Sequence, residues 1–298
     1  MAEEPSSRTA VLVCQGRAVG DGRLALGRFS DSVALRLLRG EEREAVARAR
    51  TGVPPTGWRD RMEYEMLTAT AQVVVTRSVV IDDAVRAAAN PQLVILGAGL
   101  DGRAWRMPKL ADVDVFEVDR PASQRDKRDR VEGLEPVARS VRYVPIEFGR
   151  DALAPALATA GYQDAVPTTW VWEGVLPYLS QPEVDGTIDV VAARSKSHSR
   201  LIATYPTPNL LAAVGRRAMR VYSKLAGRQD PLEHERHISA WTPEQMHHLL
   251  SARGFRVTAD HDLYAFAQQL GIPARRSRAY GLGQAVVADK PSDEPLLR

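Results

Sequence analysis

The feature that most constrains this chain is an apolar run that ends in a glycine turn. Residues 92–107, QLVILGAGLDGRAWRM, place four large apolar residues directly before Gly97, Ala98 and Gly99. A short apolar run bounded by glycine is typical of a buried strand, and glycine lets the backbone approach a ligand without a Cβ. Together with Gly102 these glycines form G-x-G-x-x-G, a pattern that indicates a nucleotide-type site when a strand precedes it and a helix follows.

Beyond this turn, short β-branched runs alternate with helical ones. The seven runs predicted as strands are residues 92–97, 113–119, 141–148, 168–174, 199–206, 256–266 and 283–289. Strands that alternate with helices predict an α/β fold whose sheet has helices on both faces. We therefore expect a Rossmann-like, seven-stranded, mostly parallel sheet in which the last two strands are antiparallel.

The chain divides into one core and its additions. The pattern from Ser30, a predicted helix start, to about Ala89 is helical and stops before Pro91, as helices do before proline. The predicted units are an N-terminal helical extension or lid at 1–90, a core at 91–290 with a helical insert at about 207–240, and a disordered tail at 291–298.

Composition limits the class of protein. The 298 residues carry a formal net charge of +3, which does not by itself indicate nucleic acid binding. The single cysteine, Cys14, fits a reducing compartment. The acidic start MAEEPSSR lacks the features of a secretory signal, and no apolar run approaches the ~20 residues that cross a bilayer. We expect a cytoplasmic protein that binds neither membrane nor nucleic acid.

Three acidic residues bear on the ligand. An acid about twenty residues past the first glycine can accept hydrogen bonds from the ribose of an adenosine, which NAD and S-adenosyl-L-methionine (SAM) share. Glu117 and Asp119 lie two residues apart on a predicted strand and so point to one face. Asp101 lies at the predicted helix start, where a carboxylate repels a pyrophosphate but suits an ammonium and a sulfonium. This favours SAM over NAD.

Four segments carry a resemblance to a known family: TRSVVIDDAV, LVILGAGLDGRAWRM, VFEVDRP and WVWEGVLPYL. In this order they resemble the leucine carboxyl methyltransferase family, and within it the bacterial branch of small-molecule O-methyltransferases, some from polyketide pathways. The resemblance runs from about Thr9 to Leu179 and continues more weakly to the C-terminus. It implies the class I SAM-dependent methyltransferase fold with added helices, SAM as cofactor with S-adenosyl-L-homocysteine as product, and a small-molecule acceptor in natural product biosynthesis.

The resemblance also implies cofactor contacts for particular residues. Arg77 matches an arginine that binds the cofactor's carboxylate, and Glu173 matches an acid near its ammonium. The turn Gly97–Gly99 matches the family's cofactor turn, and Asp119 matches its ribose acid. The pair 147–148 (Glu147 and Phe148) stands beside the adenine, where the family usually has Asp-Leu, so the longer glutamate departs from the pattern.

The sequence offers residues for an acceptor pocket but no assigned catalytic base. Tyr178, Tyr205 and Trp241 follow predicted strands or lie in the insert, where aromatics line apolar pockets or simply pack the core. Arg236 and His237 could meet an acidic substrate. The histidines of this segment have no third ligand nearby, so no metal is predicted. A carboxylate acceptor needs no base, whereas a hydroxyl acceptor does.

Two alternatives to an O-methyltransferase remain open. One is a nicotinamide-dependent oxidoreductase, because the ribose acid serves NAD equally well. The other is a SAM-binding scaffold without turnover. The basic helical segment 215–228 is either a solvated face or a docking surface for an acidic or carrier-bound substrate.

Overall fold

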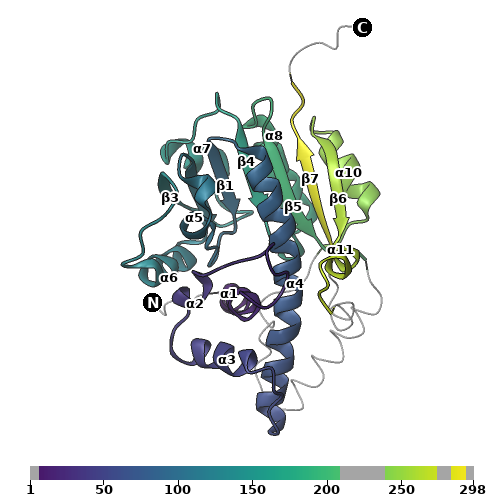
Figure 1. The fold of residues 1–298 in the computed structure, drawn as a ribbon. Helices are drawn as coiled ribbons and strands as arrows, with labels where there is room; N and C mark the ends of the chain where they lie inside the picture. The colour runs from purple at the N-terminus through teal and green to yellow at the C-terminus, as the bar shows by residue number, and fades with distance from the viewer. Residues whose placement is uncertain (1–6, 209–238, 274–282, 293–298) are drawn as a thin grey trace.

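A seven-stranded sheet with the strand order β3-β2-β1-β4-β5-β7-β6 forms the centre of the fold (Figure 1). The structure is a computed structural model that describes residues 7–208, 239–273 and 283–292. Its strands are β1 (Gln92–Leu96), β2 (Asp114–Asp119), β3 (Ser140–Pro145), β4 (Thr168–Trp172), β5 (Arg200–Tyr205), β6 (Arg256–Asp262) and β7 (Gln284–Asp289). β1 to β5 pair in parallel, and β7 is antiparallel to both β5 and β6. The predicted fold class is confirmed.

The described α-helices lie before β1 and between the strands. Their bounds are α1 (Arg8–Gly20), α2 (Ala34–Leu37), α3 (Gly40–Arg50), α4 (Trp58–Ala88), α5 (Arg103–Arg106), α6 (Pro121–Val131), α7 (Leu153–Thr159), α8 (Gln181–Ala193), α10 (Pro243–Ser251) and α11 (Leu263–Gln269). Short 3₁₀ turns are η1 (Pro108–Leu110) and η2 (Leu176–Tyr178). Within the described part of the chain, no helix is long and apolar enough to cross a membrane.

Alternation along the strands divides the apolar core into two faces. Leu93 and Ile95 of β1 join the cluster that contains residues of α1 to α4. Val94 and Leu96 join the opposite cluster, where α7, α8 and α10 pack. Successive side chains of a strand point to opposite faces, so a strand buried on both sides is apolar throughout. Figure 1 shows the long α4 crossing the sheet on the first of these faces, beside α1.

Local sequence signals set several of the element ends. α4 ends at Ala88, three residues before Pro91, and its C-cap Ala89 takes a left-handed conformation with φ of 50°. The strand predicted over 256–266 is wrong beyond Asp262. The Asp262 side chain accepts a hydrogen bond from the Ala265 backbone N–H and caps α11, so the chain becomes helical there.

The N-terminal region is organised differently from the sequence pattern. The helix expected near Ser30 is only the four-residue α2, with the Asp31 carboxylate accepting from the Ala34 backbone N–H. α1 forms at Arg8–Gly20, before the helical pattern predicted from Ser30 onward. Most of the predicted insert at 207–240 and of the tail at 291–298 lies outside the described residues.

Candidate cofactor site

The candidate site lies at the carboxyl ends of β1, β2 and β4, which are neighbours in the sheet. Chain order reverses between β1 and β4, and ligands of doubly wound sheets bind at such a switch point. The glycine turn follows β1, Asp119 ends β2, and Glu173 follows β4. Parallel pairing therefore brings together three of the residue sets predicted from the sequence.

The turn after β1 requires glycine at two positions. Gly97 and Gly99 have φ angles of 70° and 47°, in the left-handed region that residues with a Cβ avoid. A Cβ at Gly97 would lie 2.3 Å from Val175 Cγ2, and one at Gly99 would lie 3.0 Å from Ala10 Cβ. The backbone here is thus closely covered by the loop after β4 and by α1.

Asp119 is fixed at the edge of this turn. One carboxylate oxygen accepts a hydrogen bond from the Gly99 backbone N–H at 2.6 Å, and the other accepts from the Arg120 backbone N–H at 2.7 Å. The side chain is half-buried. Asp119 is therefore an oriented carboxylate at the strand end, the arrangement that ribose recognition requires.

Glu117 lies deeper in the fold than its neighbour. The register pairs Glu117 with Ile95, whereas Asp119 lies beyond the last paired residue of β1, Leu96. The Glu117 carboxylate is fully buried and bonds to the Lys127 ammonium of α6. Burial raises the pKa of Glu117 to about 7, although Lys127 acts in the opposite direction. This placement favours Asp119 over Glu117 for the ribose.

Arg77 and Glu173 face each other across the site. Arg77 extends from α4, and its Nε donates to Glu173 Oε1 at 2.7 Å. The two side chains are 15% and 8% exposed. Burial alone would raise the pKa of Glu173, but the charges of Arg103, Arg77 and Arg17 hold it well below its usual value. The two residues predicted to hold opposite ends of one ligand thus form an ion pair with each other.

Asp101 is paired within the chain. Its carboxylate accepts from the Arg103 backbone N–H at 2.7 Å and pairs with the Arg103 guanidinium. The helix that follows, α5, has only four residues. Asp101 is thus an internal partner of Arg103, and its predicted contact with the cofactor stays a prediction.

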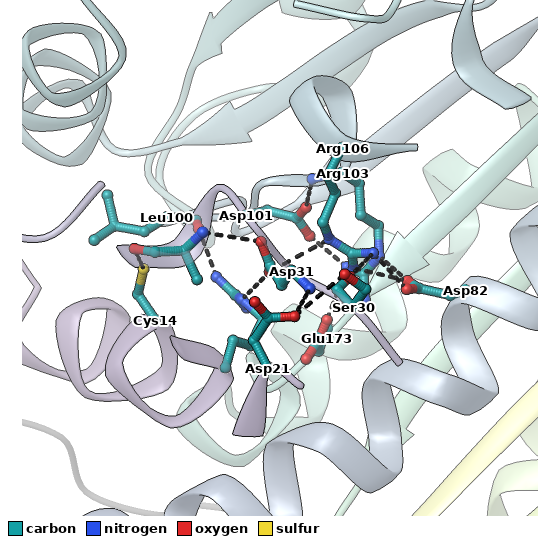
Figure 2. Close-up of polar contacts among 12 residues, drawn as sticks. Cys14, Asp21, Ser30, Asp31, Asp82, Leu100, Asp101, Arg103, Arg106 and Glu173 are labelled. Atoms are coloured by element: carbon teal, nitrogen blue, oxygen red, sulfur yellow. Dashed lines mark hydrogen bonds and ion pairs between the residues drawn. The ribbon is translucent and has the colours of Figure 1, made fainter. Parts of the chain in front are cut away.

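A buried network of charges that the sequence analysis missed supports the site (Figure 2). Arg103 binds Asp82 of α4 through Nε at 2.8 Å and Glu173 through Nη1 at 2.9 Å. Arg106 binds Asp82 at 2.7 Å, and Arg106 and Arg17 both pair with Asp31, at 3.3 and 3.1 Å. A sequence signal for this network was the aspartate pair Asp82 and Asp83 within the otherwise apolar stretch VVIDDAV.

The turn after β3 holds the predicted adenine residues. The Glu147 carboxylate accepts from Arg150 at 2.9 Å and is 46% exposed. Phe148 stacks on Trp172 with ring centroids 6.3 Å apart. Phe148 thus provides an aromatic edge near the strand ends, and Glu147 faces solvent with a local partner.

A family model matches the part of the chain that contains these residues. The sequence model of the leucine carboxyl methyltransferase family matches residues 10–192, which contain Arg77, Asp119 and Glu173. The chain belongs to the leucine carboxyl methyltransferase family.

Two curated relatives bear the description "Putative S-adenosyl-L-methionine-dependent methyltransferase". One, from Mycolicibacterium paratuberculosis, is 43% identical over 117 residues, which cover 39% of this chain and 37% of the relative. The other, from a Mycobacterium species, is 35% identical over 158 residues, 52% of each chain. The matched segment is thus between about a third and half of these relatives.

Two solved structures share the fold over nearly the whole chain. A putative methyltransferase from Thermobifida fusca superposes with a TM-score of 0.53 at 17% identity, covering 98% of this chain and 97% of that one. A DUF574 family protein from Streptomyces avermitilis gives 0.53 at 14% identity, covering 96% and 98%. The fold of this family member is the class I SAM-dependent methyltransferase fold.

The residues predicted to line an acceptor pocket in this leucine carboxyl methyltransferase family member lie in different settings. The Tyr205 hydroxyl donates to Asp260 Oδ2 at 2.6 Å, and burial together with that carboxylate raises the pKa of Tyr205. Trp241 is buried in the core, and Tyr178 is half-buried in η2. Arg236 and His237 lie outside the described residues.

Among the residues that the structure describes, no three histidine, cysteine or acidic side chains are grouped to hold an ion. The single cysteine, Cys14, lies buried in α1, and burial raises the pKa of its thiol to about 12. Cys14 therefore offers a small apolar contact and not a nucleophile.

Proposed function

We propose that this protein is a SAM-dependent methyltransferase that transfers a methyl group to an oxygen, carboxylate or hydroxyl, of a small molecule. One observation carries the proposal: the opposite charges of Arg77 and Glu173 meet beside the glycine turn and the oriented carboxylate of Asp119. SAM has a zwitterionic amino-acid end and a ribose, so it matches these three groups. A pyrophosphate would meet Glu173 as a like charge, whereas Asp119 would serve the ribose of either cofactor.

The residues present fit this cofactor. Asp119 offers an oriented carboxylate at the end of β2, as the ribose of this cofactor requires. Arg77 would hold the carboxylate, Glu173 the ammonium and Asp119 the ribose hydroxyls. Phe148 would pack beside the adenine.

Binding would then exchange partners within the site. Arg77 and Glu173 each give up the other and each gain an oppositely charged group of the ligand. Because both remain paired, the exchange leaves no buried charge without a partner, which would otherwise cost several kcal/mol. This explains how an ion pair can occupy the position at which a zwitterion binds.

The chemistry needs positioning more than reactive side chains. When bound, the cofactor would supply a methyl group on a sulfonium: the acceptor oxygen would bond to the methyl carbon as the carbon–sulfur bond breaks and S-adenosyl-L-homocysteine leaves as a neutral thioether. The chain's own residues orient the two partners, and orientation alone can supply up to ~7–11 kcal/mol of the barrier. Tyr205 is bonded to Asp260 and its pKa is raised, so it is a poor base. These facts favour an acceptor that is already ionised, such as a carboxylate of a natural product intermediate, whether free or carrier-bound.

Titration calorimetry of the full chain tests the cofactor assignment. We expect binding of SAM and S-adenosyl-L-homocysteine and no binding of NADH. Binding of NADH alone would favour the oxidoreductase. Binding of both SAM compounds, with no methyl transfer to any carboxylate or hydroxyl acceptor in a broad panel, would favour the scaffold.

A further inference from the structure

Arg103 is the most enclosed cation of the site. Its side chain is 1% exposed, and it bonds to three carboxylates from three parts of the chain: Asp82 of α4, Asp101 of the turn after β1, and Glu173 after β4. Such an arrangement is costly unless every charge is paired, because ions lose their hydration on burial. An arginine held this way has a fixed position.

The largely buried side chains of the network around Arg103 are electrically balanced. These four cations and four anions are Arg17, Arg77, Arg103, Arg106, Asp31, Asp82, Asp101 and Glu173. Arg86, whose side chain is 40% exposed, adds a 3.9 Å pair to Asp82 at the edge of this set. The formal charge of this set is therefore zero before any ligand binds. A zwitterionic amino-acid group also has no net charge, so it can join the network without unbalancing it.

The two oxygens of Glu173 are used differently. Oε1 accepts from Arg77, the more exposed of its two arginines, and Oε2 accepts from Arg103 in the interior. If a ligand takes over the contacts between Arg77 and Glu173, the bond from Arg103 remains. Arg103 is then the partner that keeps Glu173 ionised and aimed at the ligand's ammonium.

We propose that Arg103 is a positioning residue for the amino-acid end of the cofactor, acting through Glu173 and held in place by Asp82 and Asp101. This proposal rests on the proposed function, since it presumes a SAM-type ligand. Arg103 itself would not touch the ligand, in contrast to Arg77 and Glu173. It would bind Glu173 Oε2 and so hold that carboxylate in place.

The dissociation constants of two ligands distinguish a role of Arg103 in positioning Glu173 from a role in stabilising the fold. S-adenosyl-L-homocysteine carries the amino-acid end, and 5′-methylthioadenosine keeps the adenosine and sulfur but lacks that end. For Arg103→Gln we expect the Kd for S-adenosyl-L-homocysteine to rise about 10- to 100-fold. This is the change in affinity expected when a hydrogen bond to a charged group is lost. The Kd for 5′-methylthioadenosine should change less than about 3-fold. Arg103→Lys, which keeps the charge, should recover part of the loss.

Arg106 provides the matched control. It lies on the same short helix, its side chain is 5% exposed against 1% for Arg103, and it pairs with Asp82 and Asp31; within the described chain it makes no ion pair with Glu173. Arg106→Gln should therefore leave the ratio of the two dissociation constants unchanged. If Arg106→Gln alters that ratio as much as Arg103→Gln, the effect belongs to the network as a whole and the proposal is overturned.

A double-mutant cycle tests whether Arg103 acts through Glu173. In a Glu173→Gln background, Arg103→Gln should change the Kd for S-adenosyl-L-homocysteine by less than about 3-fold, because the group it positions is gone. A full effect in that background would mean a separate role for Arg103. If Arg103→Gln does not fold, Arg103→Lys decides alone: selective loss of S-adenosyl-L-homocysteine supports positioning, and equal loss of both ligands overturns it.

The wild-type protein separates this proposal from the proposed function. If it binds neither adenosine ligand, the proposed function fails and the Arg103 role with it. If it binds both, and Arg103→Gln weakens both equally, only the Arg103 role fails.

Discussion

The turn at Gly97 gives the most direct test of the site's geometry. Gly97 has φ of 70°, and a Cβ there would lie 2.3 Å from Val175 Cγ2, far inside the ~3.5–4.0 Å of a good carbon contact. A left-handed conformation costs an alanine about 1–2 kcal/mol, and overpacking a close contact costs about 1–3 kcal/mol. Gly97→Ala should therefore lower the free energy of unfolding by about 2–5 kcal/mol.

Gly174 serves as the control for this substitution. It also has a positive φ, 72°, but the nearest atom to its added Cβ is Arg77 Nη2 at 3.4 Å, an ordinary contact. Gly174→Ala should thus show only the conformational cost of about 1–2 kcal/mol. The difference between the two variants isolates the clash with Val175.

Urea denaturation of the single and double variants measures these terms. Removing the Val175 methyl groups should relieve the clash, so Val175→Ala combined with Gly97→Ala should be more stable than the sum of the single effects by about 1–3 kcal/mol. The geometric reasoning is refuted if Gly97→Ala destabilises no more than Gly174→Ala, or if the two changes simply add.

Three further predictions concern other residues of the site and core. Asp119→Asn should weaken S-adenosyl-L-homocysteine binding about 10-fold in calorimetry, because a charged acceptor held by Gly99 is lost; unchanged affinity would exclude Asp119 from the ribose site. Burial raises the pKa of Glu117 from 4.5 to about 7, so the folded state binds more protons between those values and the stability contributed by Glu117 falls as pH rises through them. Denaturation at pH 5 and pH 8 should show wild type losing stability relative to Glu117→Gln; the opposite trend contradicts the assignment. Cys14, buried with a pKa of about 12, should react with a thiol reagent only on unfolding, and rapid native labelling would disprove its burial.

Local patterns in the sequence were sufficient for the sheet and for part of the site. The apolar run before Gly97 is a strand, and Asp119 ends the next strand beside it. Both follow from the alternation of side chains and from the rule that parallel strands end at one edge. The same alternation put Glu117 on the face of Asp119, but it could not show that Glu117 pairs with Ile95 inside the sheet.

The partners in the buried ion pairs could not be predicted from local sequence patterns. The sequence pattern did not show that Asp101 and Asp82 both bind Arg103, and Asp82 was not singled out at all. Glu173 and Arg77 were identified only through the family resemblance, and their contact joins residues 96 positions apart. A sequence pattern gives the charge of a side chain but not the neighbour that neutralises it.

The sequence by itself determined where strands and turns form, because periodicity and glycine conformation are properties of adjacent residues. The tertiary structure alone decided which charges are buried together, because α4, α5 and the loop after β4 meet only when the sheet is assembled. Coulomb energy depends on distance and on exclusion of water, and both are fixed by packing between segments far apart in the chain.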